Sequence, residues 1–201
     1  MDKIFTLLVF IFSAVVHEVA HGLVAEKFGD DTARDAGRIT LNPIPHIDPF
    51  GSILLPGLLL LAGSPIVFGA AKPVPVNFNN LRPQRLGMAL VSLAGPLSNL
   101  ILAVLLILPV AFHLVTGTVA NFWTMAAGIN VVLAVFNILP IPPLDGSKIV
   151  ASLLPYDLMN RLLEFERYGF LLIVVFLMLG LIDRILLPVL IFFFRIFGVS
   201  I

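Results

Sequence analysis

The sequence predicts an all-α polytopic membrane protein with about five to six membrane segments, including broken helices, because its apolar runs reach the roughly 20 residues that cross a bilayer. Hydrophobic residues make up 59% of the 201 positions and charged residues only 12%, against roughly 25% charged residues in a soluble domain. The chain also has 15 Gly and 15 Pro residues. Helix-breaking residues are tolerated in a membrane where protein or water satisfies the freed backbone groups. We therefore expect one membrane-embedded domain over residues 1–201, with broken segments around an internal polar site.

Three apolar runs are long enough to cross a bilayer without interruption, at residues 4–24, 86–114 and 119–140. The run at residues 168–199 is interrupted by Asp183 and Arg184. It forms either two short passes that meet at a polar turn or one tilted span followed by an interfacial segment. Residues 53–70 make a shorter run that Pro and Gly residues interrupt, so it is a doubtful span.

Lys and Arg concentrate in three loops, and cytoplasmic loops of membrane proteins collect these residues. Nine of the twelve cations lie in residues 25–50, 71–85 and 144–167. We place these loops in the cytoplasm of a multi-pass protein of the cell membrane, and the N-terminus and the cation-free linker at residues 111–118 outside. Because the loops on both sides of residues 53–70 are then cytoplasmic, this segment is predicted to be a re-entrant hairpin or a short β element near the polar site. A full span is the alternative.

The first apolar run contains His17-Glu18-Val19-Ala20-His21, the pattern H-E-x-x-H. Residues four positions apart share a face of an α-helix, so both imidazoles can reach one zinc ion while Glu18 acts as general base toward a metal-activated water. A buried His pair hydrogen-bonded between helices is the structural alternative. Three ionisable residues within five positions of a span are costly to bury, which favours a functional site. The helical rise places this site about 5 to 10 Å from the cytoplasmic end of the run.

A catalytic zinc site has three protein ligands and an open position, so one ligand remains to be found. The chain has no cysteine, which leaves His and carboxylate side chains. His46 lies in a loop among prolines and His113 at the outer end of a span, so both are poor candidates. Asp145 belongs to N-I-L-P-I-P-P-L-D-G at residues 137–146, which follows a span that runs toward the cytoplasm. Because prolines stop the helix, we expect Asp145 and Asn137 to reach the site from non-helical backbone. A plain turn with an exposed Asp is the alternative.

Together these motifs resemble the site-2 protease family of intramembrane zinc metalloproteases, in its compact prokaryotic branch without PDZ or CBS domains. H-E-x-x-H in a first membrane helix and N-x-x-P-x-P-P-L-D-G in a later one carry the resemblance. The segment A-G-P-L-S-N at residues 94–99 is similar to the family element G-P-x-x-N. Three loop segments, G-R-I-T-L-N-P, H-I-D-P and K-P-V-P-V-N, are also similar to loops of this branch.

The resemblance implies one zinc ion per chain, with His17, His21 and Asp145 as its ligands and Glu18 as the catalytic base. This ligand set agrees with the helical spacing of the two His residues. The implied reaction is hydrolysis of peptide bonds within or near transmembrane segments of membrane-protein substrates, as in regulated intramembrane proteolysis. Because a helical substrate hides its carbonyls in hydrogen bonds, it must unwind. We expect residues 39–50 or the hairpin to bind it by strand addition, or to plug the water route to the zinc.

Two asparagines have roles implied by the same resemblance. Asn137 is expected to bind substrate or to polarise the scissile carbonyl, and Asn99 to support the site. An intramembrane Asn also serves as a simple contact between helices. The alternative function is a metal transporter or metal-binding membrane scaffold, which explains the ligands but gives Glu18 no role and is not accompanied by repeated halves. The neutral net charge gives no reason to expect nucleic acid as a partner.

Overall fold

The computed structural model describes residues 3–48 and 72–199, and within these ranges the fold is helical without strands. In the described part of the chain, three helices are long and apolar enough to cross a membrane. They confirm the three uninterrupted spans expected from the sequence and are α1 (Lys3–Lys27), α4 (Gln84–Ala111) and α5 (Gly117–Ile138). The shorter elements are α2 (Thr32–Asp35), η1 (Ile44–His46), α6 (Asp145–Leu153), α7 (Tyr156–Glu164), η3 (Phe165–Tyr168), α8 (Gly169–Met178) and α9 (Leu181–Ile196). The hairpin expected at residues 53–70 lies outside the described residues.

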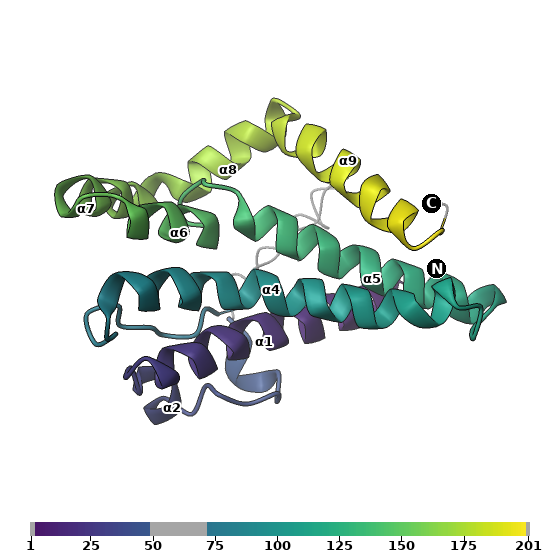
Figure 1. Cartoon of the computed structure of the whole chain (residues 1–201), viewed down its shortest axis with the longest axis horizontal. Helices are drawn as coiled ribbons and strands as arrows, with labels where there is room; N and C mark the ends of the chain where they lie inside the picture. Colours follow the sequence, from purple (N-terminus) through teal and green to yellow (C-terminus); the bar gives the residue numbers. More distant parts are fainter. Residues whose placement is uncertain (1–2, 49–71, 200–201) are drawn as a thin grey trace.

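Helix α4 is the centre of the bundle and contacts α1, α5 and α6 (Figure 1). The C-terminal half of α4 packs against α5 and α9 through a cluster of buried apolar side chains: Ala103, Ile107, Ala127, Val131, Phe193 and Phe194. Small residues allow membrane helices to approach closely. This cluster therefore holds α4 and α5 together on one side of the polar residues described below.

The run at residues 168–199 is broken, as expected, but the break lies at Gly180 and not at Asp183 and Arg184. Gly180 has a φ of 63°, a left-handed conformation that glycine adopts without a Cβ clash. Helix α8 has 10 residues and α9 has 16, so each is shorter than the roughly 20 residues of a span. Figure 1 shows the two helices meeting at an angle above α5.

Asp30 fastens an extended segment, residues 72–77, to the end of α1. The buried Asp30 carboxylate accepts hydrogen bonds from the Asn77 N–H (2.7 Å) and from Asn80 Nδ2 (2.8 Å). Burial raises the pKa of Asp30, but these bonds and those from Thr32 outweigh it and hold the pKa below its ordinary value. The ionised carboxylate thus fixes where residues 72–77 pass α1.

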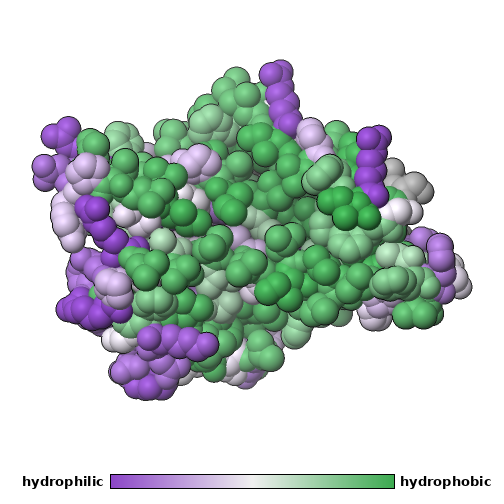
Figure 2. Space-filling model, in the orientation of Figure 1, coloured by the Kyte–Doolittle hydropathy of each residue, from purple (hydrophilic) through white to green (hydrophobic). Residues whose placement is uncertain are grey.

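The surface of the molecule is apolar along the helices and polar at their ends, as expected for helices that cross a membrane. Figure 2 shows hydrophobic residues over most of the visible face, with the largest hydrophilic areas at the end that carries α2 and α7 in Figure 1. Helices α2, α6 and α7, which belong to the cation-rich loops, lie at this end, whereas the start of α1 and residues 111–118 lie at the other (Figure 1).

We predict that a thiol introduced by Asn77→Cys reacts with an impermeant maleimide only after intact cells are permeabilised, because this position lies at the cation-rich end. The chain has no other cysteine, and Asn77 is exposed, so failure to label does not reflect burial. Thr116→Cys, at the exposed linker on the other end, is the matched control and should label in intact cells. Labelling of position 77 from outside would overturn the orientation.

Candidate metal centre and active site

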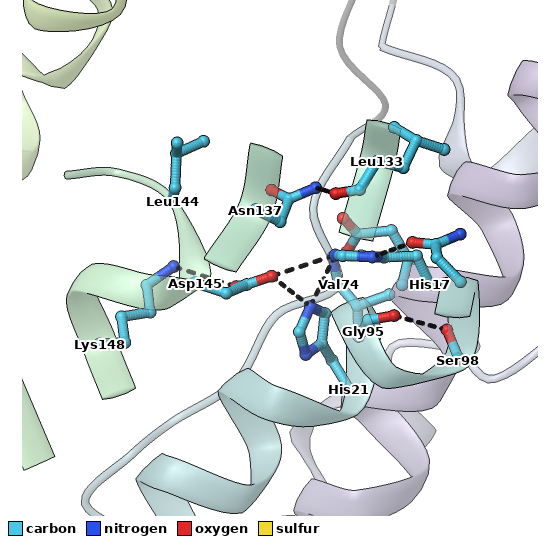
Figure 3. Close-up of polar contacts among 12 residues, drawn as sticks. His17, His21, Val74, Gly95, Ser98, Leu133, Asn137, Leu144, Asp145 and Lys148 are labelled. Atoms are coloured by element: carbon cyan, nitrogen blue, oxygen red, sulfur yellow. Dashed lines mark hydrogen bonds and ion pairs between the residues drawn. The ribbon is translucent and has the colours of Figure 1, made fainter. Parts of the chain in front are cut away.

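Three buried side chains that could hold a metal ion meet where α1 faces the start of α6: His17, His21 and Asp145. Asp145 Oδ2 lies 3.1 Å from His17 Nε2 and 3.2 Å from His21 Nε2, and the two Nε2 atoms are 3.0 Å apart (Figure 3). Atoms that bind one zinc ion tetrahedrally at about 2.0 Å lie about 3.3 Å from one another. The donor set and its spacing therefore fit zinc, with one position left for water or substrate.

Each imidazole of the pair is oriented by a carbonyl oxygen at its other nitrogen. The Nδ1–H of His17 donates to Asn99 Oδ1 and that of His21 donates to the Val91 backbone oxygen, each at 2.6 Å. A carbonyl oxygen accepts only, so the proton of each neutral ring lies on Nδ1. Both Nε2 atoms are left with a lone pair toward Asp145, which is the form that binds a metal.

Gly95 brings the backbone of α4 directly against these nitrogen atoms (Figure 3). A Cβ at this position would lie 2.4 Å from His21 Nε2 and 2.5 Å from His17 Nε2. Only glycine permits such a close approach of backbone to a ligand site. The sequence motif A-G-P-L-S-N therefore contributes space for the metal centre through its glycine and an acceptor through Asn99.

Asp145 reaches the site as the first residue of α6, so the expectation that it lies on non-helical backbone was wrong. A second glycine explains how α6 begins so close to the end of α5: a Cβ at Gly146 would lie 2.1 Å from the Ile138 carbonyl oxygen. Lys148, one turn further along α6, places Nζ 4.0 Å from Asp145 Oδ1 and donates to the Pro143 carbonyl.

Glu18, the predicted base, binds the backbone of a segment that follows residue 71. Its Oε2 accepts the backbone N–H of Val74 at 2.7 Å, in the extended segment that follows residue 71. Val74 stands between Pro73 and Pro75, and proline has no backbone N–H. The only backbone donor of this tripeptide is thus committed to Glu18.

The two predicted asparagines differ in their relation to the site. Asn99 lies at the site, where it accepts from His17. Asn137 is part of the last turn of α5, because the helix continues to Ile138 before the prolines stop it, so the non-helical backbone expected for it was wrong. Its Nδ2 donates to the Leu133 carbonyl of its own helix at 3.0 Å (Figure 3).

The remaining histidines lie away from the metal centre, as the sequence suggested. His46 is buried in its loop and donates from Nε2 to the Thr40 carbonyl, and His113 is exposed after α4. The sequence reasoning missed Asn130, a buried residue that binds Asn99. Its position seven residues before Asn137 places both on one face of α5, a signal that would have found it.

Comparisons with known proteins agree with a metalloprotease site. The family model for "Peptidase family M50" matches residues 112–181. The chain is 44% identical over 190 residues to "Putative zinc metalloprotease YwhC" of Bacillus subtilis, covering 90% of this chain and 83% of that protein. It is 34% identical to "Putative zinc metalloprotease Rip2" of Mycolicibacterium smegmatis, over 94% of this chain and 73% of that protein. It is also 34% identical to "Putative zinc metalloprotease MJ0611" of Methanocaldococcus jannaschii, over 73% of this chain and 72% of that protein. No solved structure matches the chain at a significant level.

We predict that Gly95→Ala lowers the zinc content of the purified protein at least tenfold, because the added methyl group displaces both His side chains. Gly128→Ala on α5 is the matched control, since its added Cβ meets nothing closer than 3.6 Å, at Phe194 Cζ. Metal analysis by mass spectrometry should find one zinc per chain for the wild type and for the control. Full zinc content in the Gly95→Ala protein would contradict the assigned geometry.

Proposed function

The chain belongs to peptidase family M50, the site-2 protease family of zinc-dependent intramembrane proteases, and we propose that His17, His21 and Asp145 hold its zinc ion while Glu18 acts as general base. One observation carries the three ligand assignments: two Nε2 atoms and one carboxylate oxygen converge within about 3 Å inside a bundle of membrane helices, as expected for three ligands of one ion. The hydrogen bonds at both Nδ1 atoms are those of metal-binding histidines.

When bound, zinc supplies Lewis acidity, which lowers the pKa of an attacking water toward about 7 and polarises a carbonyl. In the proposed reaction Glu18 takes a proton from the water at its carboxylate and later delivers that proton to the nitrogen of the leaving amine. The Val74 N–H binds Oε2 of Glu18, so we assign the proton to Oε1.

Asn137 is the proposed donor to the scissile carbonyl. Of the two hydrogens on its Nδ2, one is used by the Leu133 carbonyl. The other is available to an oxygen that gains negative charge during attack, and such donors stabilise the transition state of acyl transfer. Asn99 has a supporting role, because it holds the ring of His17 and does not face the reacting atoms.

The substrates we propose are transmembrane segments of other membrane proteins, cut from the cytoplasmic side during regulated intramembrane proteolysis. His21 lies six residues before the end of α1 at Lys27, which corresponds to about 9 Å along the helix. The active site then opens near the cytoplasmic face of the cell membrane, with the N-terminus outside. A substrate helix must unwind there before its carbonyls are accessible. The extended edge expected over residues 39–50 for binding it was wrong at Ile44–His46, because these residues form the 3-10 helix η1.

We predict that Glu18→Gln strongly slows cleavage while zinc remains bound, since the amide cannot take a proton. In proteoliposomes, kcat for a tagged single-span protein with helix-breaking residues in its span should fall by about 10² to 10⁴. Zinc content should stay at one per chain. Glu26→Gln, the same change on the same helix at a residue that pairs with Arg34, is the matched control and should retain activity.

Two outcomes would contradict the proposal. Undiminished cleavage by the Glu18→Gln protein would remove Glu18 from the mechanism. Zinc transport into the vesicles by the wild type, without hydrolysis of the tagged protein, would favour a carrier.

A further inference from the structure

We propose that Asn130 is a positioning residue for the metal centre, acting on His17 through Asn99. This inference rests on the proposed role of His17 as a zinc ligand. Asn130 lies on α5 and has only 1% of its surface exposed. Its hydrogen bonds go to Asn99, Ser13 and Ala126, and none goes to Glu18 or to the three proposed ligands.

The buried side chains form one connected network across three helices. Asn130 Oδ1 accepts from Asn99 Nδ2 at 3.0 Å, and Asn130 Nδ2 donates to Ser13 Oγ and to the Ala126 carbonyl, each at 2.9 Å. Asn99 Nδ2 also donates to the Ser13 carbonyl at 3.2 Å, and Asn99 Oδ1 accepts from His17 Nδ1 at 2.6 Å. Helices α5, α4 and α1 each contribute to this network.

Two backbone carbonyls determine which way both amides point. The Ala126 carbonyl only accepts, so the amide nitrogen of Asn130 must face it and the amide oxygen of Asn130 must face Asn99. The Ser13 carbonyl likewise requires the amide nitrogen of Asn99. The oxygen of Asn99 is then the atom left for His17, which places the His17 proton on Nδ1 and its lone pair on Nε2. Each hydrogen bond from Asn130 on α5 to His17 therefore has a defined donor and a defined acceptor.

The network also lies along the face of α1 that carries the ligands. Ser13 and His17 are four residues apart, so they are stacked on consecutive turns of one helix face. Loss of Asn130 would leave one hydrogen of Asn99 Nδ2 without its acceptor in an apolar interior, where an unsatisfied group is costly. Asn99 Nδ2 then keeps only its longer bond to the Ser13 carbonyl, at 3.2 Å. The amide that orients His17 is therefore held less firmly.

A purely structural role for Asn130 makes a different prediction. As a simple contact between helices it would contribute to stability, with no effect on the ring of His17. Asn130→Leu separates the two roles, because it keeps the branched shape of the side chain and removes both the donor and the acceptor. Val131→Ala, at the neighbouring buried position on α5, controls for a general loss of packing.

The first experiment measures zinc affinity and kinetics in proteoliposomes. For the Asn130→Leu protein we expect about a tenfold loss of zinc affinity in competition with a chelator, and about a tenfold lower kcat with KM within twofold. Asn130→Asp should retain most of both, because in its neutral form it keeps an acceptor for Asn99 and one donor for Ser13. Unchanged zinc affinity and kcat in a folded Asn130→Leu protein would overturn the proposal.

The second experiment reads the hydrogen bond of His17 directly in zinc-loaded protein, where the ring proton is on Nδ1. The chain has four histidines, so ¹⁵N-histidine NMR resolves each ring, with His17→Gln assigning the signal. The Nδ1–H of His17 should exchange slowly with water in the wild type and at least tenfold faster in Asn130→Leu. The Val131→Ala protein should match the wild type. An unchanged exchange rate in Asn130→Leu would mean that Asn130 acts on stability alone, which would overturn the proposal.

A double-mutant cycle tests the route through Asn99. If Asn130 acts only through Asn99, adding Asn130→Leu to Asn99→Ala should lower zinc affinity no further. Additive losses would overturn the route. If the proposed function fails, the wild type itself will lack bound zinc or hydrolysis. If only the role of Asn130 fails, the wild type will have both, and the Asn130 variants will match it.

Discussion

The proposed metal centre depends on the register between α1 and α4. Helix α4 supplies none of the three proposed ligands, yet it provides the acceptors for both imidazoles, Asn99 Oδ1 and the Val91 carbonyl, and the space beside them at Gly95. A shift of α4 by one residue would rotate these three features by about 100° around its axis. The histidines would then face a side chain in place of glycine and lose the carbonyls that determine their tautomer. The remaining elements of the site depend on this packing.

The cost of polar groups inside an apolar bundle explains why the network is complete. A buried amide or hydroxyl without a partner costs several kcal/mol in hydrocarbon. The buried polar groups of Ser13, Asn99 and Asn130 bind one another, the His17 ring or a backbone carbonyl. The apolar packing of α4 with α5 and α9 brings these side chains together, and their hydrogen bonds in turn fix the relative rotation of the helices.

The features predictable from the sequence were those set by local spacing. The three long spans follow from apolar run lengths, and the meeting of His17 and His21 follows from the helical repeat. The approach of Asp145 was expected from its motif, but α5 continued to Ile138 and α6 began at Asp145 itself, so the irregular backbone was shorter than proline content implied. The Val91 carbonyl and the Val74 N–H were not predictable, because backbone groups have no side-chain signature and their partners depend on tertiary packing.

The extended segment that holds Glu18 has a consequence for any peptide that lies beside it. Between Lys72 and Pro75 there are two backbone N–H groups: that of Lys72 binds the His46 carbonyl and that of Val74 binds Glu18. Arg38 in turn binds the carbonyls of Lys72 and Pro73. A peptide pairing with this stretch must donate its own amides to the carbonyls that remain. If it requires an amide in return, it competes with Glu18 for a single hydrogen atom.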